Sequence, residues 1–246
     1  APNRPQFTPA QRKLPARPEF YDFGLMQAHQ GDSELAARPL REISYVVFDC
    51  EMTGLQPLQG DEVIQIGAVR IVQDRVLTGE GMEWLINPGR PIPPASIKFH
   101  GLTDADVTDK PPISEVLPIF HDFVGDAVMV GDNAAFDMKF LTLKERSAKV
   151  RFENPVLDTM LISSMLDGEE EDHSLDALCD RYGISIAGRH TALGDTIGTA
   201  ELLLKMIDRL EAKGLNTFGE VMKASNMAAE LRHRGAIIAH GARTAS

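Results

Sequence analysis

The chain has 246 residues, 43% of them hydrophobic, which is enough to bury a full core in one domain of moderate size with appendages. Its formal net charge of −11 argues against a protein that coats duplex DNA through a basic face. This charge does not exclude a nuclease that binds a few terminal nucleotides through metal ions, because bound cations reverse the local electrostatic field.

The N-terminal region, residues 1–42, divides into an arm and a packing segment. Residues 1–18 hold five prolines, four basic residues and no acidic residue, a composition typical of an extended arm. The residues that follow include Phe20 and Phe23, and we expect them to pack against the main body. A start at Ala1 rather than methionine is compatible with a fragment of a longer protein.

Three strands are predicted next. Residues 43–48 are rich in β-branched and aromatic side chains, which indicates a buried central strand. Residues 62–72 form a second strand, and residues 76–86 return as a third after a turn at Gln73 and Asp74. The short connections predict an antiparallel arrangement of these three strands.

The chain then alternates between helices and short strands as far as residue 212. Ser174 and Gly183 bound one of the helices as its N-cap and C′ residues. This alternation predicts a mixed sheet covered by helices. The predicted helices are residues 112–123, 134–148, 174–183 and 191–212, and the predicted strands are residues 127–130 and 155–158.

The last segment, residues 213–246, looks peripheral. Residues 217–234 have apolar side chains at helical spacing, which favours a helix packed on the body over a partner-binding helix. Four basic or imidazole side chains form a small basic tail. We expect this tail to be exposed to solvent rather than in contact with a phosphate backbone. The four residues are Arg232, His233, Arg234 and Arg243.

Cysteine usage and hydropathy suggest the compartment. Cys50 and Cys179 lie in apolar segments without the spacing of metal ligands, which favours buried free thiols in a reducing compartment. No stretch approaches about 18 continuous apolar residues, and the N-terminus has no signal-peptide pattern. We therefore expect a soluble, cytoplasmic protein with no membrane segment.

Asp49 and Glu51 stand at the end of the first predicted strand, on either side of Cys50. Side chains two residues apart on a strand point to the same face, so the two carboxylates project together. They repel each other unless a cation lies between them, and Mg²⁺ and Mn²⁺ prefer such oxygen ligands. Taken alone, an Asp-x-Glu pair is more often two solvated acids.

Two more acids lie at predicted helix starts. Asp137 falls in the first turn after residues 127–130, where open α/β sheets place their binding crevices, although such an acid also complements a helix dipole. Asp195 follows His190 by five residues, which on one helix would separate them by roughly 140°, so His190 is expected in the preceding loop. A histidine near a metal-activated water acts as a general base, whereas an isolated one is usually an ordinary loop residue.

Six short stretches, taken in order, carry a resemblance to a known family: 48–55 (FDCEMTGL), 63–69 (VIQIGAV), 100–103 (HGLT), 133–137 (NAAFD), 174–179 (SLDALC) and 190–195 (HTALGD). The chain resembles the DEDDh group of 3′→5′ exonucleases, and within that group the proofreading epsilon subunit of bacterial DNA polymerase III. The resemblance covers residues 43 to about 210, and the ordered set is far more specific than any single stretch.

The resemblance implies an RNase H-like α/β fold, with a mixed five-stranded sheet, its first three strands antiparallel, flanked by helices. It implies an exonuclease domain over residues 43–212, a hydrolase that releases nucleoside 5′-monophosphates from single-stranded or frayed DNA. The implied cofactors are two Mg²⁺ or Mn²⁺ ions. The implied partners are a nucleic acid 3′ end and a polymerase or other fused or associated domain.

The resemblance also assigns roles to residues. Asp49, Glu51 and Asp195 would bind the first metal. Asp49 would bridge to the second, with Asp137 contributing directly or through water. His190 would take the proton from the attacking water.

On the substrate side, the backbone of Met52, Thr53 and Gly54 would meet the terminal 3′-OH. Leu55 would wedge against the terminal base. Phe136 would line the sugar pocket, and Asn133 would make a polar contact.

Asp132 departs from the family pattern, which often has histidine before the Asn-Ala-x-Phe-Asp stretch. A negative charge there is expected to change how the substrate strand is held. Residues 49–55 are also similar to oligoribonucleases, which leaves RNA open as a substrate. A catalytically idle nucleic-acid-binding or partner-binding module stays open as well, as does an endonuclease of related fold.

Overall fold

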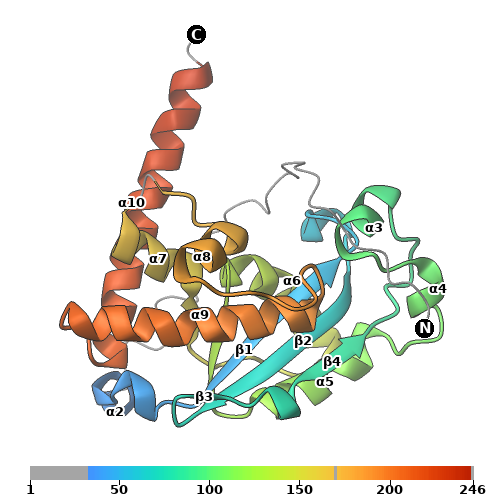
Figure 1. Cartoon of the computed structure of the whole chain (residues 1–246). Coiled ribbons are helices and arrows are strands. Elements are labelled where there is room, and N and C mark those ends of the chain that lie inside the picture. Colours follow the sequence, from blue (N-terminus) through green and yellow to red (C-terminus); the bar gives the residue numbers. More distant parts are fainter. Residues whose placement is uncertain (1–32, 169–170, 245–246) are drawn as a thin grey trace, which may run out of the picture.

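The computed structural model describes residues 33–168 and 171–244, with side chains described as far as residue 233. The predicted arm, and the packing segment up to residue 32, lie outside these residues, as do the side chains of Arg234 and Arg243. The described chain forms a mixed sheet with helices on both faces (Figure 1). This confirms the predicted α/β class.

The sheet is built around a central strand, β1, with antiparallel neighbours on one side and parallel neighbours on the other. The prediction of a third strand at residues 76–86 needs adjustment, because a 3-10 turn, η3 (Thr78–Glu80), divides this segment into two short strands. Both pieces pair with β2, so the sheet has six strands rather than five. The strands are β1 (Tyr45–Met52), β2 (Val63–Val72), β3 (Arg75–Val76), β4 (Met82–Leu85), β5 (Val128–Gly131) and β6 (Val156–Asp158).

The predicted helices are present within a few residues of their expected bounds. Ser174 Oγ accepts a hydrogen bond from the Ala177 N–H at 3.4 Å, and Gly183 ends the same helix with φ 64°. Short helices that the sequence pattern had not indicated lie before and between them. The described helices are α2 (Ser33–Ala37), η1 (Leu40–Glu42), η2 (Pro57–Gln59), α3 (Pro94–His100), α4 (Asp104–Val107), α5 (Ile113–Val124), α6 (Ala134–Ala148), α7 (Thr159–Asp167), α8 (Leu175–Tyr182), α9 (Ala192–Ala212) and α10 (Phe218–Thr244).

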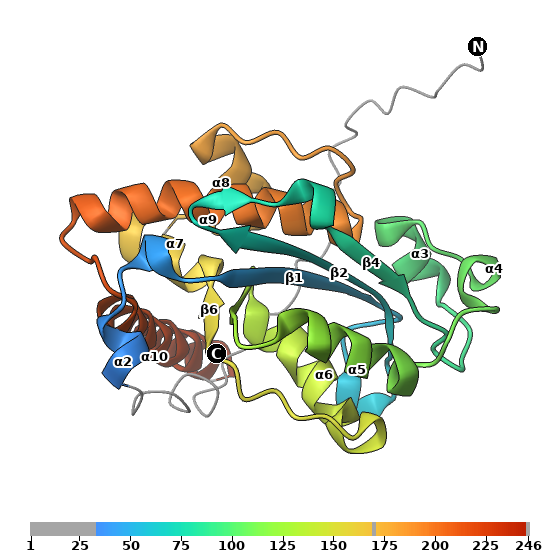
Figure 2. The ribbon, with the colours of Figure 1, turned by 90° about the horizontal axis from the view of Figure 1, so that it is seen from below.

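Alternate residues of β1 face two different helix layers. Tyr45 and Val47 belong to the core that β1 shares with α9, whereas Val46 and Phe48 belong to the core shared with α5 and α6. Figure 2 shows α9 on one side of the sheet and α5 and α6 on the other. By this alternation, Asp49 and Glu51 point to the α9 side.

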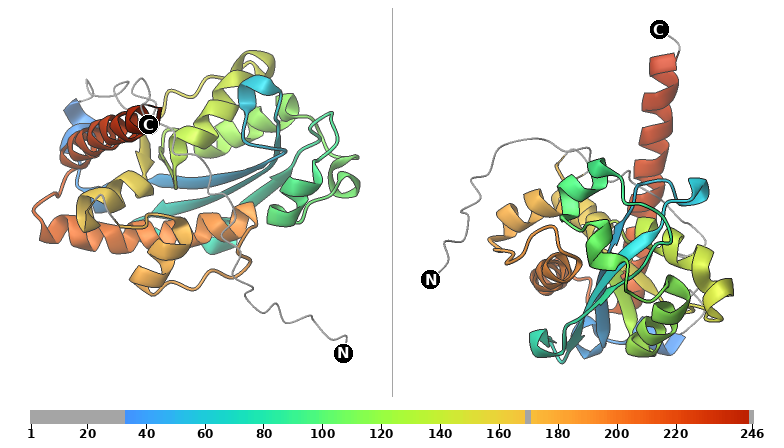
Figure 3. Two further views of the ribbon diagram at one scale, coloured as in Figure 1. Left: turned by 90° about the horizontal axis from the view of Figure 1, so that it is seen from above. Right: turned by 90° about the vertical axis from the view of Figure 1, so that its right-hand side faces the viewer.

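The C-terminal helix α10 is longer than the predicted residues 217–234. Its first turns are buried through Phe218 and Val221, and Gly219 lies close enough to Ala36 of α2 that an added Cβ would come within 3.0 Å. Burial continues as far as Ala229, which clusters with Met160 and Leu161 of α7, and the C-terminal end of the helix extends away from the body (Figure 3). Within the described residues, no helix combines the length and the apolarity needed to cross a membrane.

Candidate metal centre

Three carboxylates meet at the carboxyl end of β1. Asp49 and Glu51 come from β1, and Asp195 comes from the first turn of α9. Each offers an oxygen within 4.8 Å of the oxygens offered by the other two, and this is the one such cluster of three or more acid, His or Cys side chains in the described part of the chain. Glu51 is 8% exposed and Asp195 6%, so these two carboxylates have little bulk water to screen them.

The start of α9 reaches β1 because a glycine of β2 lets the two backbones come close together. Gly67 pairs with Asp49 across the two strands, and a Cβ on Gly67 would lie only 2.4 Å from the backbone carbon of Ala192. Gln65 Oε1 accepts a hydrogen bond from the Ala192 N–H at 3.2 Å, which satisfies one of the N–H groups left over at the helix start. Thr196 Oγ1 donates to the Gly67 carbonyl at 3.3 Å. These contacts bring Asp195 beside Asp49.

The electrostatics of the cluster match a site for a hard cation. Burial and the nearby charge of Asp49 raise the pKa of Asp195, while the Arg189 guanidinium and the His190 N–H oppose that rise. A divalent ion would relieve the repulsion between these acids, and three carboxylates are the donor set that Mg²⁺ and Mn²⁺ prefer. The residues present therefore fit such an ion.

Asp137 approaches β1 from the opposite helix layer. The pairing of β1 with β5 ends at Val47 and Val130, and three residues farther along β1 the Cys50 N–H donates to Asp137 Oδ1 at 3.2 Å. Asp137 is 1% exposed and lies in the first turn of α6. The structure therefore places it against the backbone between Asp49 and Glu51, although it is not one of the three clustered acids.

His190 lies in the loop before α9, as the spacing predicts. Its φ is 66°, its side chain is exposed, and its N–H donates to Asp195 Oδ1 at 3.2 Å. The ring is not part of the three-acid cluster. His190 is therefore joined to a cluster acid through its backbone.

A buried carboxylate, Asp158, supports the turn that precedes α6. Asp158 Oδ1 accepts hydrogen bonds from the Asn133 N–H at 3.0 Å and the Met160 N–H at 2.9 Å. Burial, followed by the charge of Asp132, raises the pKa of Asp158 to about 7. Asn133 has φ 56° and is 6% exposed, and Asp132 Oδ1 accepts a hydrogen bond from Thr159 Oγ1 at 2.9 Å. Asp132 thus takes part in holding this turn.

The predicted substrate-binding segment forms a tight loop after β1. Met52 and Thr53 are buried, and the Thr53 N–H and carbonyl are both engaged, by the Glu62 carbonyl at 2.8 Å and Ser96 Oγ at 2.6 Å. Asp61 closes the loop by accepting from Thr53 Oγ1 at 3.2 Å and from the Gln56 N–H at 3.0 Å. A Cβ on Gly54 would lie 2.3 Å from the Asp61 carboxylate.

Two predicted substrate contacts differ in accessibility. Leu55 is 42% exposed and is available to touch a ligand. Phe136 is 3% exposed and packs its ring against Phe140 at 5.5 Å, within the core shared by β1, α5 and α6. Its side chain thus belongs mainly to the core.

Four residues that shape the site had no assigned role in the sequence interpretation. Gln65 and Gly67 lie inside one of the six matching stretches, so the family resemblance could have pointed to them. Arg189, which contacts Asp195, and Asp61 stand outside those stretches, and only their contacts identify them.

Comparison with known proteins places the chain in context. The sequence profile described as Exonuclease matches residues 46–203. The DNA polymerase III subunit epsilon-like protein of Rhodobacter capsulatus is 51% identical over 208 residues, which is 84% of this chain and 29% of that protein. The PolC-type DNA polymerase III of Bacillus subtilis is 36% identical over 188 residues, 76% of this chain and 13% of that protein. The chain therefore spans less than a third of these relatives.

Solved structures agree with the sequence comparison. Exonuclease X in complex with 5′ overhanging duplex DNA matches with a TM-score of 0.57 and 28% identity, over 74% of this chain and 99% of that one. E. coli exonuclease I in complex with a dT13 oligonucleotide matches with a TM-score of 0.59 and 18% identity, over 70% of this chain and 42% of that one. The second likeness shows the fold alone, which is RNase H-like.

Proposed function

The chain belongs to the exonuclease family, and we propose that it hydrolyses the terminal phosphodiester at the 3′ end of single-stranded or frayed DNA, releasing nucleoside 5′-monophosphates. The observation that carries this proposal is the convergence of Asp49, Glu51 and Asp195 within 4.8 Å of one another. The DNA complex of exonuclease X, covered over almost its full length, supports DNA as the substrate. RNA remains an outcome of the test below.

We assign the work of the site to the following residues. Asp49, Glu51 and Asp195 hold divalent cations, and Asp137 supports a second ion directly or through water. Two Mg²⁺ or Mn²⁺ ions held there would supply positive charge for the phosphate in the transition state and activate the attacking water.

The other residues contact the substrate or accept a proton. His190 accepts the proton of the attacking water from its exposed loop position. The backbone at Gly54 approaches the terminal 3′-OH, because the neighbouring Thr53 N–H and carbonyl are already engaged. Leu55, the exposed apolar side chain of this loop, packs against the terminal base.

The relatives suggest where the activity is used. Both sequence relatives described above are named as DNA polymerase III proteins, which supports association with a polymerase or with further domains. The two described cysteines are buried thiols, which supports a reducing, cytoplasmic environment. We therefore propose a role at DNA ends during replication or repair.

The proposal is tested with 5′-labelled DNA and RNA oligomers of one sequence, digested in parallel with Mg²⁺, with Mn²⁺ and with a chelator. We expect a ladder that shortens from the 3′ end of DNA, stops with chelator and leaves circular single-stranded DNA intact. Preferred digestion of short RNA would instead identify an oligoribonuclease-type enzyme. Cutting of the circle would identify an endonuclease, and saturable Mn²⁺ binding without monophosphate release would identify an idle binding module.

Replacing His190 with alanine is expected to lower kcat by roughly 10²- to 10⁴-fold, because a general base contributes about that factor. Affinity for Mn²⁺ should change little, since the ring is outside the three-acid cluster. The measurement is kcat from oligomer digestion alongside a calorimetric Mn²⁺ titration. His121→Ala, on α5 in the opposite helix layer, is the control and should leave both values unchanged. Equal losses of kcat and Mn²⁺ binding would show that His190 is a ligand instead.

A further inference from the structure

Arg189 joins two carboxylates of very different burial. Its Nη1 forms an ion pair with Asp195 Oδ2, and its Nε donates to Asp176 Oδ1 at 2.6 Å. Asp195 belongs to the three-acid cluster and its side chain is 8% exposed, whereas the Asp176 side chain, on α8, is 66% exposed. The guanidinium therefore lies between the cluster and the protein surface.

Both oxygens of Asp195 carry a contact from the loop before α9. Oδ2 faces Arg189, and Oδ1 accepts the His190 N–H at 3.2 Å. A divalent ion bound by Asp195 would therefore approach a carboxylate whose charge is already compensated by a guanidinium. A positive charge this close opposes the binding of a second cation, and the low exposure of Asp195 limits screening by water.

Asp176 offers the guanidinium a second anchor. Because the Asp176 contact uses Nε and the Asp195 contact uses Nη1, release of Asp195 does not require the contact with Asp176 to break. The Asp176 side chain is 66% exposed, so solvent screens its attraction for the guanidinium and the arginine stays within reach of Asp195. The arginine thus has one fixed partner and one that a cation can take over.

Building on the proposed function, we propose that Arg189 is a resident counter-ion that competes with divalent cations for Asp195, while Asp176 retains its guanidinium when a cation takes that carboxylate. Arg189 is a positioning residue in this arrangement, since it acts through Asp195. It holds the acid cluster together without a cation and sets the cation concentration at which the site fills.

The test is a Mn²⁺ titration of the full chain, by calorimetry, comparing the unaltered protein with Arg189→Met. Methionine keeps an apolar side chain of similar length and removes the charge. We expect the Kd for Mn²⁺ to fall by about tenfold, because one neighbouring charge shifts the ionisation equilibrium of a carboxylate by about that factor or more. The Tm without divalent ions should fall, and the rise in Tm on adding Mn²⁺ should become larger.

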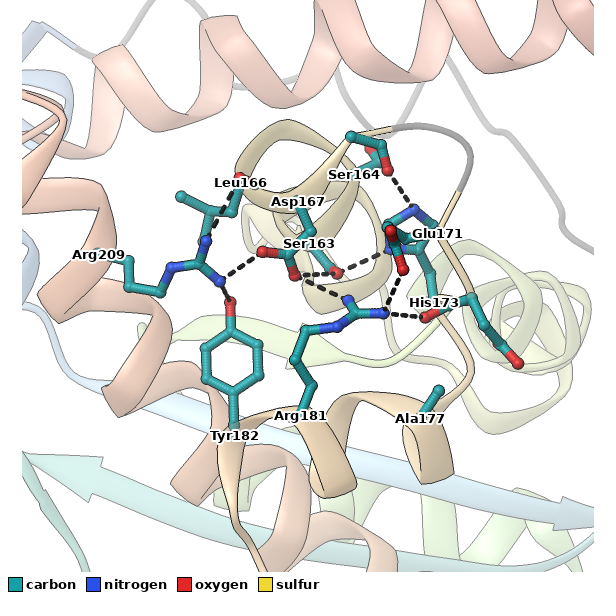
Figure 4. Close-up of polar contacts among 12 residues, drawn as sticks. Ser163, Ser164, Leu166, Asp167, Glu171, His173, Ala177, Arg181, Tyr182 and Arg209 are labelled. Carbon is teal, nitrogen blue, oxygen red and sulfur yellow. Dashed lines mark hydrogen bonds and ion pairs between the residues drawn. The ribbon is translucent and has the colours of Figure 1, made fainter.

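The chain offers a matched control in Arg181, which bridges Asp167 at 2.8 Å and Glu171 at 3.4 Å (Figure 4). Its side chain is 27% exposed against an 8% exposed aspartate, the same values as for Arg189 and Asp195. Asp167 is not in the three-acid cluster. Arg181→Met is therefore expected to lower the Tm without changing the Kd for Mn²⁺.

Charge-conserving and double variants complete the test. Arg189→Lys should keep the Kd near that of the unaltered protein, and Arg189→Gln replaces Arg189→Met if the latter does not fold. Asp176→Asn should weaken Mn²⁺ binding when Arg189 is present. In the Arg189→Met background the same substitution should weaken it much less, as expected if Asp176 acts through the arginine.

The outcomes separate this inference from the function on which it rests. If Mn²⁺ binds the unaltered protein and Asp49→Asn weakens that binding, but Arg189→Met leaves the Kd unchanged or raises it, competition by Arg189 is overturned and the metal centre stands. If the unaltered protein binds no Mn²⁺, both the inference and the proposed function are wrong.

Discussion

Replacing Asp49 with asparagine is expected to abolish divalent-dependent release of monophosphates while the fold stays intact. Asp49 contributes one of the three clustered carboxylates, so the variant loses both a ligand and a unit of negative charge. Loss of about 4 kcal/mol of transition-state stabilisation corresponds to a decrease in kcat/KM of roughly 10³-fold, and we expect at least this much. The measurement is monophosphate release from a labelled oligomer at saturating Mn²⁺.

Stability separates a functional from a structural role for Asp49. Its carboxylate lies among like charges, so its neutralisation should leave the Tm in chelator unchanged or higher. Glu83→Gln, which removes an exposed carboxylate from β4, changes the net charge equally and should leave kcat/KM unchanged. Asp195→Ala should also abolish hydrolysis. The metal centre would be assigned wrongly if Asp49→Asn kept activity within tenfold of the unaltered protein, or if its Tm collapsed.

Replacing Gly67 with alanine is expected to destabilise the fold strongly. The added Cβ would lie 2.4 Å from the Ala192 carbonyl carbon and 2.5 Å from the Leu193 nitrogen, and both are backbone atoms. Neither can move aside without shifting the start of α9 away from β2. We expect a loss of about 3 kcal/mol in the free energy of unfolding, at the upper end for overpacked positions. Denaturant unfolding measures it.

The same substitution tests how α9 places Asp195. A shift of about 1 Å in a catalytic group can lower the rate roughly 10²-fold, so the folded fraction of Gly67→Ala should still be poorly active. Gly79→Ala is the control, because an added Cβ there meets nothing within 4 Å, and it should change stability by less than about 0.5 kcal/mol. If Gly67→Ala behaved like the control, the docking of α9 on β2 would not determine the site.

Local patterns predicted the features that depend on neighbouring residues. The two-residue period of a strand placed Asp49 and Glu51 on one face, and the structure has them there, on the α9 side of the sheet. The caps Ser174 and Gly183 bounded α8, and Thr191 caps α9 by accepting from the Gly194 N–H at 3.1 Å. These features follow from backbone geometry within a few residues of chain.

One expectation failed where contacts between distant residues decide. The third predicted strand is interrupted because its two ends pair with different parts of β2. The contact of Phe136 with the sugar stays a prediction, and its side chain is 3% exposed in the core between β1, α5 and α6. The sequence around Phe136 does not show which way the ring points, since that depends on the helices packed around it.

By itself the sequence determined the α/β class, the end of β1 as the place for the acids, and the family. The family resemblance predicted that Asp195 joins Asp49 and Glu51, but only the tertiary structure shows how, through a helix start that contacts Gln65, 127 residues earlier in the chain. The tertiary structure alone decided that Arg189 spans Asp195 and Asp176. The physical reason is that strand period and helix capping act over a few residues. The approach of two backbones, and the charges it brings together, depends on the shapes of segments far apart in sequence.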